Sequence, residues 1–362
     1  MMHAWLDPLW RRLLALGERL PHALLITGMP GLGQRDLAEA WAARLLCEAP
    51  APDGQACGHC RSCLWRRAGN HPDLRRLTPE SEEERTDAGD ESLADERPAD
   101  GEAGGREGKA KKSTQIVIGQ VRAVQDALTV TAHRGGRRAV IVDPAEAMNA
   151  ITANALLKLL EEPPEGCVFL LVSSAPRKLL PTLRSRCQQW NVPRPDAGLL
   201  RRWREGQGGG HVSDGLLALC GGMPLAAQRL AEQGAEALLE RFTRDLGADG
   251  IDPLRLAAQW EAWLKKDKAA LAAGFGVVTL VDWMQRWVSD LAVLRLGGRV
   301  RYFPAQAECL AALSARMSVA AASNCYNEFL NIRKVAAHPL NLRLFVEDML
   351  MRYARMIKGG RS

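Results

Sequence analysis

A glycine-rich loop between an apolar run and a helical pattern places the strongest constraint on the fold of this chain. The apolar run covers residues 23–26, and a helical pattern starts at residue 34. The loop between them contains Gly28, Gly31 and Gly33. A strand, a glycine-rich loop and a helix in this order form a P-loop, the phosphate-binding element of many α/β proteins. The sequence therefore predicts the scaffold of a nucleotide-binding domain.

The two residues that follow Gly33 are not those of an active P-loop. An active loop has a lysine there, which binds the β- and γ-phosphates, and then a Ser or Thr that ligates Mg²⁺. This chain has Gln34 and Arg35 instead. Glutamine carries no charge and arginine cannot ligate a cation. We expect a degenerate nucleotide site, and a plain glycine-rich turn is the alternative for this segment taken alone.

A second part of the expected site is Asp143, which follows the apolar run 138–142. A P-loop ATPase has an aspartate at this strand end to hold Mg²⁺ and directly after it a glutamate that activates water. Here Pro144 follows Asp143, and Glu146 lies three residues on. On the residues alone, an aspartate that only caps a turn is the favoured interpretation. Its role as a remnant of a nucleotide site is the alternative.

Four cysteines with the spacing C-x9-C-x2-C-x2-C predict a metal site: Cys47, Cys57, Cys60 and Cys63. Four thiolates around one ion leave no open coordination position, which is typical of structural zinc. His59 and His71 are possible substitutes for one of the thiolates. Free buried cysteines are the alternative, but three cysteines within seven residues disfavour it.

The order of sequence patterns predicts an α/β domain followed by helical domains. Apolar runs at 23–26, 138–142 and 167–172 alternate with helical patterns, which indicates a parallel sheet with helices on both faces. After about residue 193 the strand patterns fade, and amphipathic helices continue to residue 356. A chain of 362 residues has room for two or three domains.

An acidic window at residues 78–112 departs from this organisation. It contains twelve Asp or Glu and six Lys or Arg, a net charge of −6. Because the whole chain carries +6, the remaining residues carry +12. The window has almost no large apolar side chains, so we expect a disordered surface insertion, with a binding tail as the alternative. The absence of a membrane-spanning apolar run and of a leader pattern favours a cytoplasmic protein.

Arg186 lies in the segment Ser185-Arg186-Cys187, after the last predicted strand of the α/β domain. A solvated surface arginine is the favoured interpretation of this residue taken alone. The alternative is an arginine finger, which stabilises the transition state at a nucleotide bound to a neighbouring subunit. A degenerate site in the same chain gives this arginine no nucleotide of its own.

Several segments together resemble the clamp-loader subunits of bacterial DNA polymerase III, which belong to the AAA+ family. Besides the four cysteines, the matching segments are HALL at 22–25, HPD at 71–73, NALLKLLEEPP at 154–164, LRSRC at 183–187 and NLRLFVEDML at 341–350. The resemblance spans nearly the whole chain except the acidic insertion, and it reverses the preference for Arg186 in favour of an arginine finger in trans.

The resemblance also implies a division into three domains. Residues 1–193 are expected to form a degenerate AAA+ P-loop domain with a zinc knot at 47–63 and the insertion at 78–112. Residues 194–240 are expected to form a small helical lid domain, and residues 241–362 a helical collar for oligomerisation. In the segment 221–224, Pro224 stands where related ATPase subunits have a nucleotide-binding arginine.

The resemblance implies a subunit of a DNA-directed DNA polymerase holoenzyme, a nucleotidyltransferase, and we expect no ATPase activity of the chain itself and no use of ATP or Mg²⁺. The resemblance further implies that the chain helps to load the sliding clamp onto primed DNA during replication. The expected partners are the ATPase (tau/gamma) subunits, the delta subunit, the clamp indirectly, and DNA bound without sequence specificity.

Two other functions are less consistent with the sequence. An active ATPase subunit with an unusual loop is opposed by Gln34, Arg35, Pro144 and Pro224. A stand-alone zinc-dependent nucleic-acid-binding protein is opposed by the cysteine knot, which lacks the base-reading helix of DNA-binding zinc fingers.

Overall fold

The computed structural model describes residues 3–80, 113–129, 136–206, 209–248, 250–338 and 341–358. The predicted insertion at 78–112 lies outside these residues from position 81 onward. The chain divides into two compact units, Met1–Pro193 and Arg194–Ser362. Each unit is described below by itself.

The first unit is built around a five-stranded sheet with the strand order β2-β3-β4-β1-β5. The strands are β1 (Ala23–Thr27), β2 (Leu74–Leu77), β3 (Arg138–Val142), β4 (Cys167–Ser173) and β5 (Gln188–Asn191). All four strand pairs are parallel. Every residue of β1, β3 and β4 is buried, as expected for central strands that are covered on both faces. The predicted parallel sheet is confirmed.

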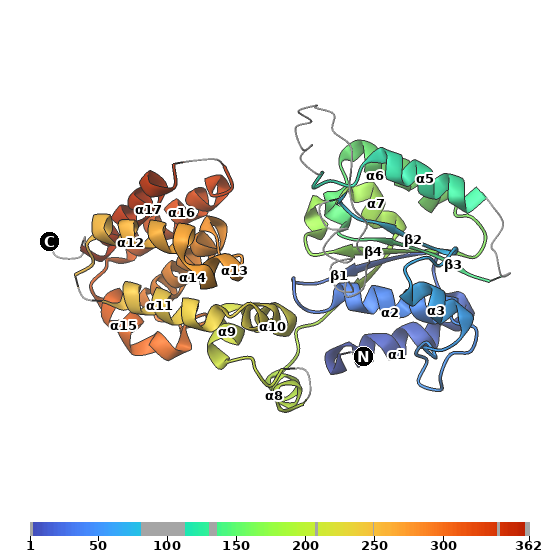
Figure 1. The fold of residues 1–362 in the computed structure, drawn as a ribbon, viewed down its shortest axis with the longest axis horizontal. Helices are drawn as coiled ribbons and strands as arrows, with labels where there is room; N and C mark the ends of the chain where they lie inside the picture. The colour runs from blue at the N-terminus through green and yellow to red at the C-terminus, as the bar shows by residue number, and fades with distance from the viewer. Residues whose placement is uncertain are drawn as a thin grey trace, which may run out of the picture. The chain divides into compact units, whose positions relative to one another are not determined.

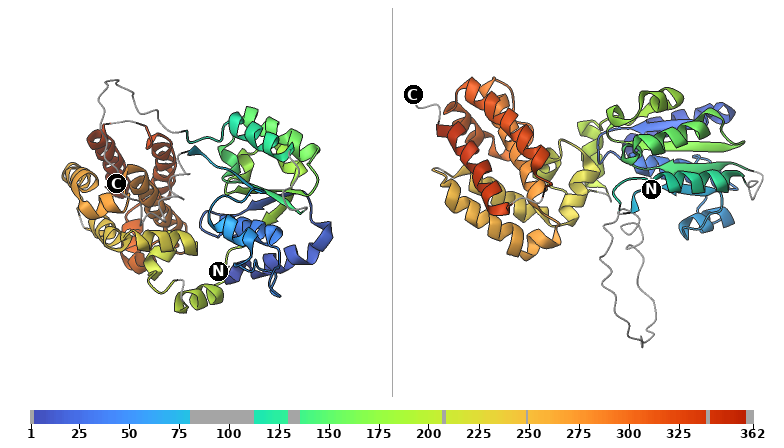
Figure 2. Two further views of the ribbon diagram at one scale, coloured as in Figure 1. Left: turned by 45° about the vertical axis from the view of Figure 1, so that its right-hand side comes forward. Right: turned by 90° about the horizontal axis from the view of Figure 1, so that it is seen from above.

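Helices cover both faces of this sheet (Figure 1; the turned views of Figure 2 show the same two layers). One layer contains α1 (Asp7–Leu16), α2 (Gln34–Leu46) and α3 (Arg61–Arg67), and the other contains α5 (Ile118–Thr129), α6 (Ala150–Glu161) and α7 (Pro181–Arg186). Successive strand residues point to opposite faces. Leu25, Val140 and Phe169 therefore share one hydrophobic core with Val124 of α5 and Leu156 of α6.

Short 3-10 turns complete this unit: η1 (Ala4–Leu6), η2 (Gly17–Arg19), η3 (Ala145–Ala147) and η4 (Pro176–Lys178). Two of them matter for the site. η1 precedes α1 near the N-terminus, and η3 follows β3 directly after Asp143 and Pro144.

All the regular secondary structure among the described residues of the second unit is helical. It contains α8 (Ala197–Glu205), α9 (Asp214–Leu219), α10 (Pro224–Glu232), α11 (Ala235–Gly247), α12 (Pro253–Lys266), α13 (Lys268–Ala272), α14 (Val277–Arg295), η5 (Pro304–Gln306), α15 (Ala307–Ala315), α16 (Val319–Val335) and α17 (Leu342–Lys358). One cluster of buried side chains extends from Val212 to Met356. The expected lid boundary at residue 240 falls inside α11, and the division into lid and collar stays a prediction.

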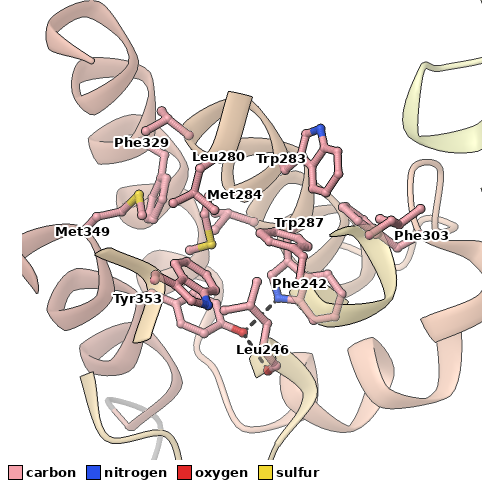
Figure 3. Close-up of a cluster of buried hydrophobic side chains, with 14 of the residues drawn as sticks. Phe242, Leu246, Leu280, Trp283, Met284, Trp287, Phe303, Phe329, Met349 and Tyr353 are labelled. Atoms are coloured by element: carbon pink, nitrogen blue, oxygen red, sulfur yellow. Dashed lines mark hydrogen bonds between the residues drawn. The ribbon is translucent and has the colours of Figure 1, made fainter. Parts of the chain in front are cut away.

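Aromatic side chains dominate the core of the second unit (Figure 3). Phe242 of α11 lies 5.6 Å from Trp283 and 6.2 Å from Trp287 between ring centres, both on α14. Nε1 of Trp287 donates a hydrogen bond of 2.8 Å to the Tyr353 hydroxyl of α17. The hydroxyl in turn donates to the Leu246 carbonyl at 3.5 Å. These bonds satisfy polar atoms inside an apolar core and connect three helices.

No helix in the described parts of the chain combines the length and the apolar character needed to cross a membrane.

Candidate functional site

The loop between β1 and α2 has the backbone shape that its glycines predict. Gly31 and Gly33 have φ angles of 88° and 89°, in the left-handed region that favours glycine. Gly33 is the residue that caps the N-terminus of α2. The chain therefore turns from the buried strand into the helix as a P-loop does.

Gln34, at the position of the P-loop lysine, is turned back into the loop. The residue is only 7% exposed, and its Nε2 atom donates to the carbonyl of Met29 at 2.8 Å. A Cβ atom on Gly28 would lie 2.8 Å from the same Nε2 atom, so a larger residue there would have to displace the Gln34 amide. The amide group is thus engaged within the protein, where an active loop presents a cation to phosphate.

Arg35, at the position of the Mg²⁺-binding hydroxyl, forms an ion pair with Asp143. Nε of Arg35 donates to the carboxylate of Asp143, whose side chain is 10% exposed. The carboxylate lies at the carboxyl end of β3, where a P-loop ATPase holds its metal ion. A guanidinium group therefore occupies the place of the cation beside this aspartate, and Asp143 does more than cap a turn.

The N-terminal segment packs against the same loop. Nε1 of Trp5 donates to the carbonyl of Leu32 at 2.8 Å, and the ring of His3 stacks on Trp5 at 4.7 Å. His3 also lies 3.1 Å from the Asp36 carboxylate on the first turn of α2. This hydrogen bond holds the pKa of Asp36 below its usual value. Sequence reasoning missed this contact, because residues 3–6 carry no periodic pattern.

The Glu146 side chain accepts hydrogen bonds from the segment that follows β4. Its Oε1 atom accepts from the backbone N–H of Ser174 at 3.0 Å, from the Ser174 hydroxyl at 2.8 Å and from the N–H of Ala175 at 3.1 Å. Burial raises the pKa of Glu146, but hydrogen bonds, among them those from Ser173 and Ser174, outweigh burial and lower it. These contacts tie η3 to the end of β4, which is a structural role.

The four predicted cysteines lie together on the same side of the sheet as α2 and α3. Their sulfur atoms are all within 4.8 Å of one another, and three of the separations are 3.7, 3.9 and 4.0 Å. A Zn–S bond of about 2.3 Å places tetrahedral sulfur ligands about 3.8 Å apart. Cys47 follows the end of α2 and Cys60 caps the start of α3. The group fits a tetrahedral metal ion such as zinc.

Backbone N–H groups point at these sulfur atoms. Cys57 N donates to Cys47 Sγ at 3.2 Å, Cys60 N to Cys57 Sγ at 3.3 Å, and Cys63 N to Cys60 Sγ at 3.4 Å. Such bonds favour the thiolate form that a metal requires. The backbone of His59 and Cys60 lowers the pKa of Cys57 to about 7, whereas burial raises the pKa of Cys63 to about 12.

Neither histidine considered as a substitute belongs to this group. His71 is buried, its Nδ1 accepts from the N–H of Asp73 at 3.0 Å, and its Nε2 lies 2.7 Å from the Ser62 hydroxyl. Because Nδ1 accepts, we assign the proton of the ring to Nε2. Ser62 then donates to the carbonyl of Leu46, the last residue of α2. His71 thus stabilises the cysteine-bearing segment through its contact with Ser62 and does not belong to the ligand group. His59 is exposed and contacts the carbonyl of Cys57.

Arg186 is the last residue of α7, and its side chain is 55% exposed. Nη2 of Arg186 donates to Oε1 of Glu161, the last residue of α6, at 3.0 Å. Leu183 and Cys187 on either side are buried and anchor this segment to the core. The arginine is therefore held at the surface of the first unit.

Pro224 is the first residue of α10 and follows Gly221 and Gly222, which have φ angles of 64° and 81°. A proline suits the first turn of a helix, because its missing N–H would have no partner there. Its side chain cannot make the charged contact that an arginine at this position would make.

The first unit is a parallel α/β domain with a P-loop backbone. Its loop lacks the lysine and the metal-binding hydroxyl, which defines a relative of the P-loop nucleotide-binding proteins with a degenerate loop. Comparison with known proteins narrows this class. The family model described as "DNA polymerase III, delta subunit" matches residues 10–196, more than half of the chain. The chain is 37% identical to DNA polymerase III subunit delta' of Pseudomonas aeruginosa over 302 residues, which cover 81% of this chain and 77% of that protein. It belongs to the delta' family of DNA polymerase III clamp-loader subunits.

More distant relatives carry the name of another subunit. The DNA polymerase III subunit gamma/tau of Mycobacterium bovis is 28% identical over 249 residues, 66% of this chain and 37% of that protein. A crystal structure of a DNA polymerase III, gamma subunit-related protein from Thermotoga maritima covers 98% of this chain and 99% of that one, at 18% identity and a TM-score of 0.47.

Proposed function

We propose that this chain hydrolyses no ATP itself and helps ATPase subunits of a clamp loader to place the sliding clamp on primed DNA. The observation that carries this proposal is the ion pair of Arg35 with Asp143 beside the buried Gln34 amide. Together these three residues occupy the positions that bind phosphate and Mg²⁺ in an ATPase.

The charges in this region oppose a nucleotide–metal complex. A Mg²⁺ ion bound to Asp143 would lie next to the Arg35 guanidinium, and two like charges at close range repel each other. Displacing the arginine would cost its interaction with a carboxylate that is largely shielded from water. The chain supplies no lysine and no hydroxyl at these two positions to offset these costs.

A direct test measures ATP turnover by the purified full-length chain. We expect no turnover above that of an Asp143→Asn variant prepared in the same way, which controls for contaminating ATPases. Steady turnover by the wild-type chain that the Asp143→Asn variant lacks would contradict the proposal. Binding of a fluorescent ATP analogue with and without Mg²⁺ would then show which part of the site is active.

Arg186 is the residue that we propose to act on nucleotide, at the ATP site of a neighbouring subunit. Its exposure and its fixed place at the end of α7 support this role. A guanidinium can donate two parallel hydrogen bonds to the developing charge on a γ-phosphate. Arginine fingers that act in trans contribute about 10³–10⁵ in rate in other nucleotide hydrolases.

The four-cysteine group is proposed to hold a structural zinc ion through Cys47, Cys57, Cys60 and Cys63. The sulfur separations, and four cysteines that fill all four positions of a tetrahedral ion, support zinc in a closed site. When bound, the ion supplies positive charge that holds four thiolates together. The chain's own part is to bring the end of α2 and the start of α3 to the same point.

The proposed partners follow from the family. They are the tau/gamma ATPase subunits and the delta subunit, with the sliding clamp contacted indirectly. Primed DNA would be attracted through its phosphates without sequence reading, which the net charge of +12 outside residues 78–112 supports. Residues 194–240 and 241–362 are proposed to serve as lid and as oligomerising collar beside the P-loop domain 1–193.

A further inference from the structure

The hydrogen bond between Arg186 and Glu161 indicates that Glu161 also takes part in the proposed function of Arg186. We propose that Glu161 is a positioning residue, which holds the Arg186 side chain ready for the ATP site of the neighbouring subunit. The inference rests on the proposed function of Arg186 and deepens it. Two observations support the inference. Nη2 of Arg186 donates a hydrogen bond of 3.0 Å to Oε1 of Glu161, and each of the two residues has buried neighbours in the chain.

The backbone of both residues is fixed by the hydrophobic core. Glu161 ends α6 directly after the buried residues Leu159 and Leu160. Arg186 stands between the buried residues Leu183 and Cys187, which are 0% and 7% exposed. Movement of the pair is therefore restricted largely to the two side chains, whose exposed fractions are 55% for Arg186 and 51% for Glu161.

An exposed arginine without a partner populates many rotamers, and each binding event must freeze them. A carboxylate that holds the guanidinium in one place lowers this entropic cost before the nucleotide arrives. Glu161 is bonded to Nη2 only, so the guanidinium keeps further N–H donors for phosphate oxygens. Glu161 can thus orient Arg186 without using up its hydrogen-bonding capacity.

The same contact would have the opposite effect if Glu161 kept the arginine away from phosphate. The two roles predict opposite changes in the ATPase rate when Glu161 is replaced. Removal of a competing carboxylate would raise the rate, and removal of a positioning carboxylate would lower it. Both groups are more than half exposed, so water screens the attraction between them. The effect of Glu161 on rate is therefore limited to about two- to fivefold, the range of an exposed ion pair.

The test uses the full chain in a reconstituted clamp loader, with ATPase stimulated by the clamp and primed DNA. The variants are Glu161→Gln, Arg186→Ala and both together. Glu162→Gln is the matched control, because it removes the same charge one residue away. Glu162 is also exposed, and the described part of the chain shows no ion pair for it.

We expect Glu161→Gln to lower the part of kcat that Arg186→Ala removes about two- to fivefold, with an unchanged KM for ATP and an unchanged Tm of the isolated chain. Glu162→Gln should match the wild type, and the double variant should match Arg186→Ala, because Glu161 acts only through Arg186. A rate for Glu161→Gln equal to or above that of the control would overturn the inference. So would a further loss on adding Glu161→Gln to Arg186→Ala.

The ATPase rates of the variants also distinguish failure of the arginine finger from failure of the positioning role. If Arg186→Ala leaves the ATPase of the complex unchanged, the arginine finger itself is wrong and the role of Glu161 falls with it. If Arg186→Ala lowers the rate and Glu161→Gln does not, the finger stands and only the positioning role is wrong.

Discussion

Arg35 at the start of α2 donates to the carboxylate of Asp143 at the end of β3, 108 residues further along the chain. In a P-loop ATPase these two positions are connected through a Mg²⁺ ion that arrives with the nucleotide. Here the connection is a direct ion pair within the protein. The helix and the strand are therefore joined by two side chains of the protein itself, which fits the proposal that this chain hydrolyses no ATP.

The first prediction concerns the stability that this pair provides. Arg35→Ala leaves the shielded Asp143 carboxylate without this donor, and we expect a loss of about 1–3 kcal/mol in the free energy of unfolding. Urea denaturation of the full chain measures it. Arg177→Ala, an exposed arginine on η4, serves as the control and should have no effect. Equal midpoints for the two variants would show that the ion pair contributes nothing.

Zinc content gives a second prediction. Protein purified without chelators should contain one zinc ion per chain, and its removal should lower Tm by more than about 5 °C, since each kcal/mol corresponds to about 2–4 °C in a unit of this size. Cys60→Ser should have the same effect, whereas Cys309→Ser in the second unit should not. Elemental analysis and calorimetry decide this, and metal-free protein of unchanged Tm would refute the site.

The third prediction is that Arg186→Ala affects the assembly and not the fold. Its only partner among the described residues is exposed, so Tm of the isolated variant should equal that of the wild type. The ATPase rate of the reconstituted clamp loader should fall by the share of the one ATP site that Arg186 serves, far less than the loss of about 10³–10⁵ in a single-site enzyme, because the other sites remain active. Wild-type ATPase and clamp loading by the variant complex would reduce Arg186 to a surface residue.

The hydrogen bond between Trp287 and Tyr353 gives a fourth prediction, for the second unit. Tyr353→Phe removes the acceptor of a buried indole N–H, which should cost about 1–3 kcal/mol of stability. Tyr326→Phe removes a hydroxyl from a half-buried tyrosine of α16 and should cost less than about 0.5 kcal/mol. Chemical denaturation of the two variants compares them directly. A Tyr353→Phe variant as stable as Tyr326→Phe would contradict the expectation.

A fifth prediction concerns acid stability through Glu146. Its pKa in the folded protein lies below the ordinary value of 4.5, so its contribution is complete above that pH and is lost as pH falls through the folded pKa. Glu146→Gln should therefore lower the free energy of unfolding by about 1 kcal/mol at pH 7, a small value because the side chain is partly exposed. The difference from the wild type should shrink below about pH 4.5. Glu162→Gln is the control. A difference that grows towards low pH would show the opposite linkage.

Much of the fold could be predicted from the sequence because its central strands are continuous apolar runs. The runs at 23–26, 138–142 and 167–172 became β1, β3 and β4. The edge strands β2 and β5 were missed, since Leu74–Leu77 contains two arginines and only one residue of Gln188–Asn191 is buried. An edge strand has one exposed side and gives no continuous apolar pattern.

Only part of the candidate site could be predicted from the sequence. The spacing of the cysteines predicted their cluster, because residues close in sequence can meet without knowledge of the fold. The contacts of Asp143 with Arg35, and of Trp5 with Leu32, join segments far apart in sequence, and no local pattern encodes such pairings. The role of His71 was also missed, since a hydrogen-bonded support and a metal ligand require the same residue type.

The packing of residues 3–6 on the P-loop has a consequence for attempts to engineer this region. The Gln34 amide, the Arg35 guanidinium and the stack of His3 on Trp5 occupy adjoining parts of one region, each through its own bonds. Changing any one of them leaves the other two in place. A design that builds an ATP site here must therefore replace all three groups together, since each one is held by bonds of its own.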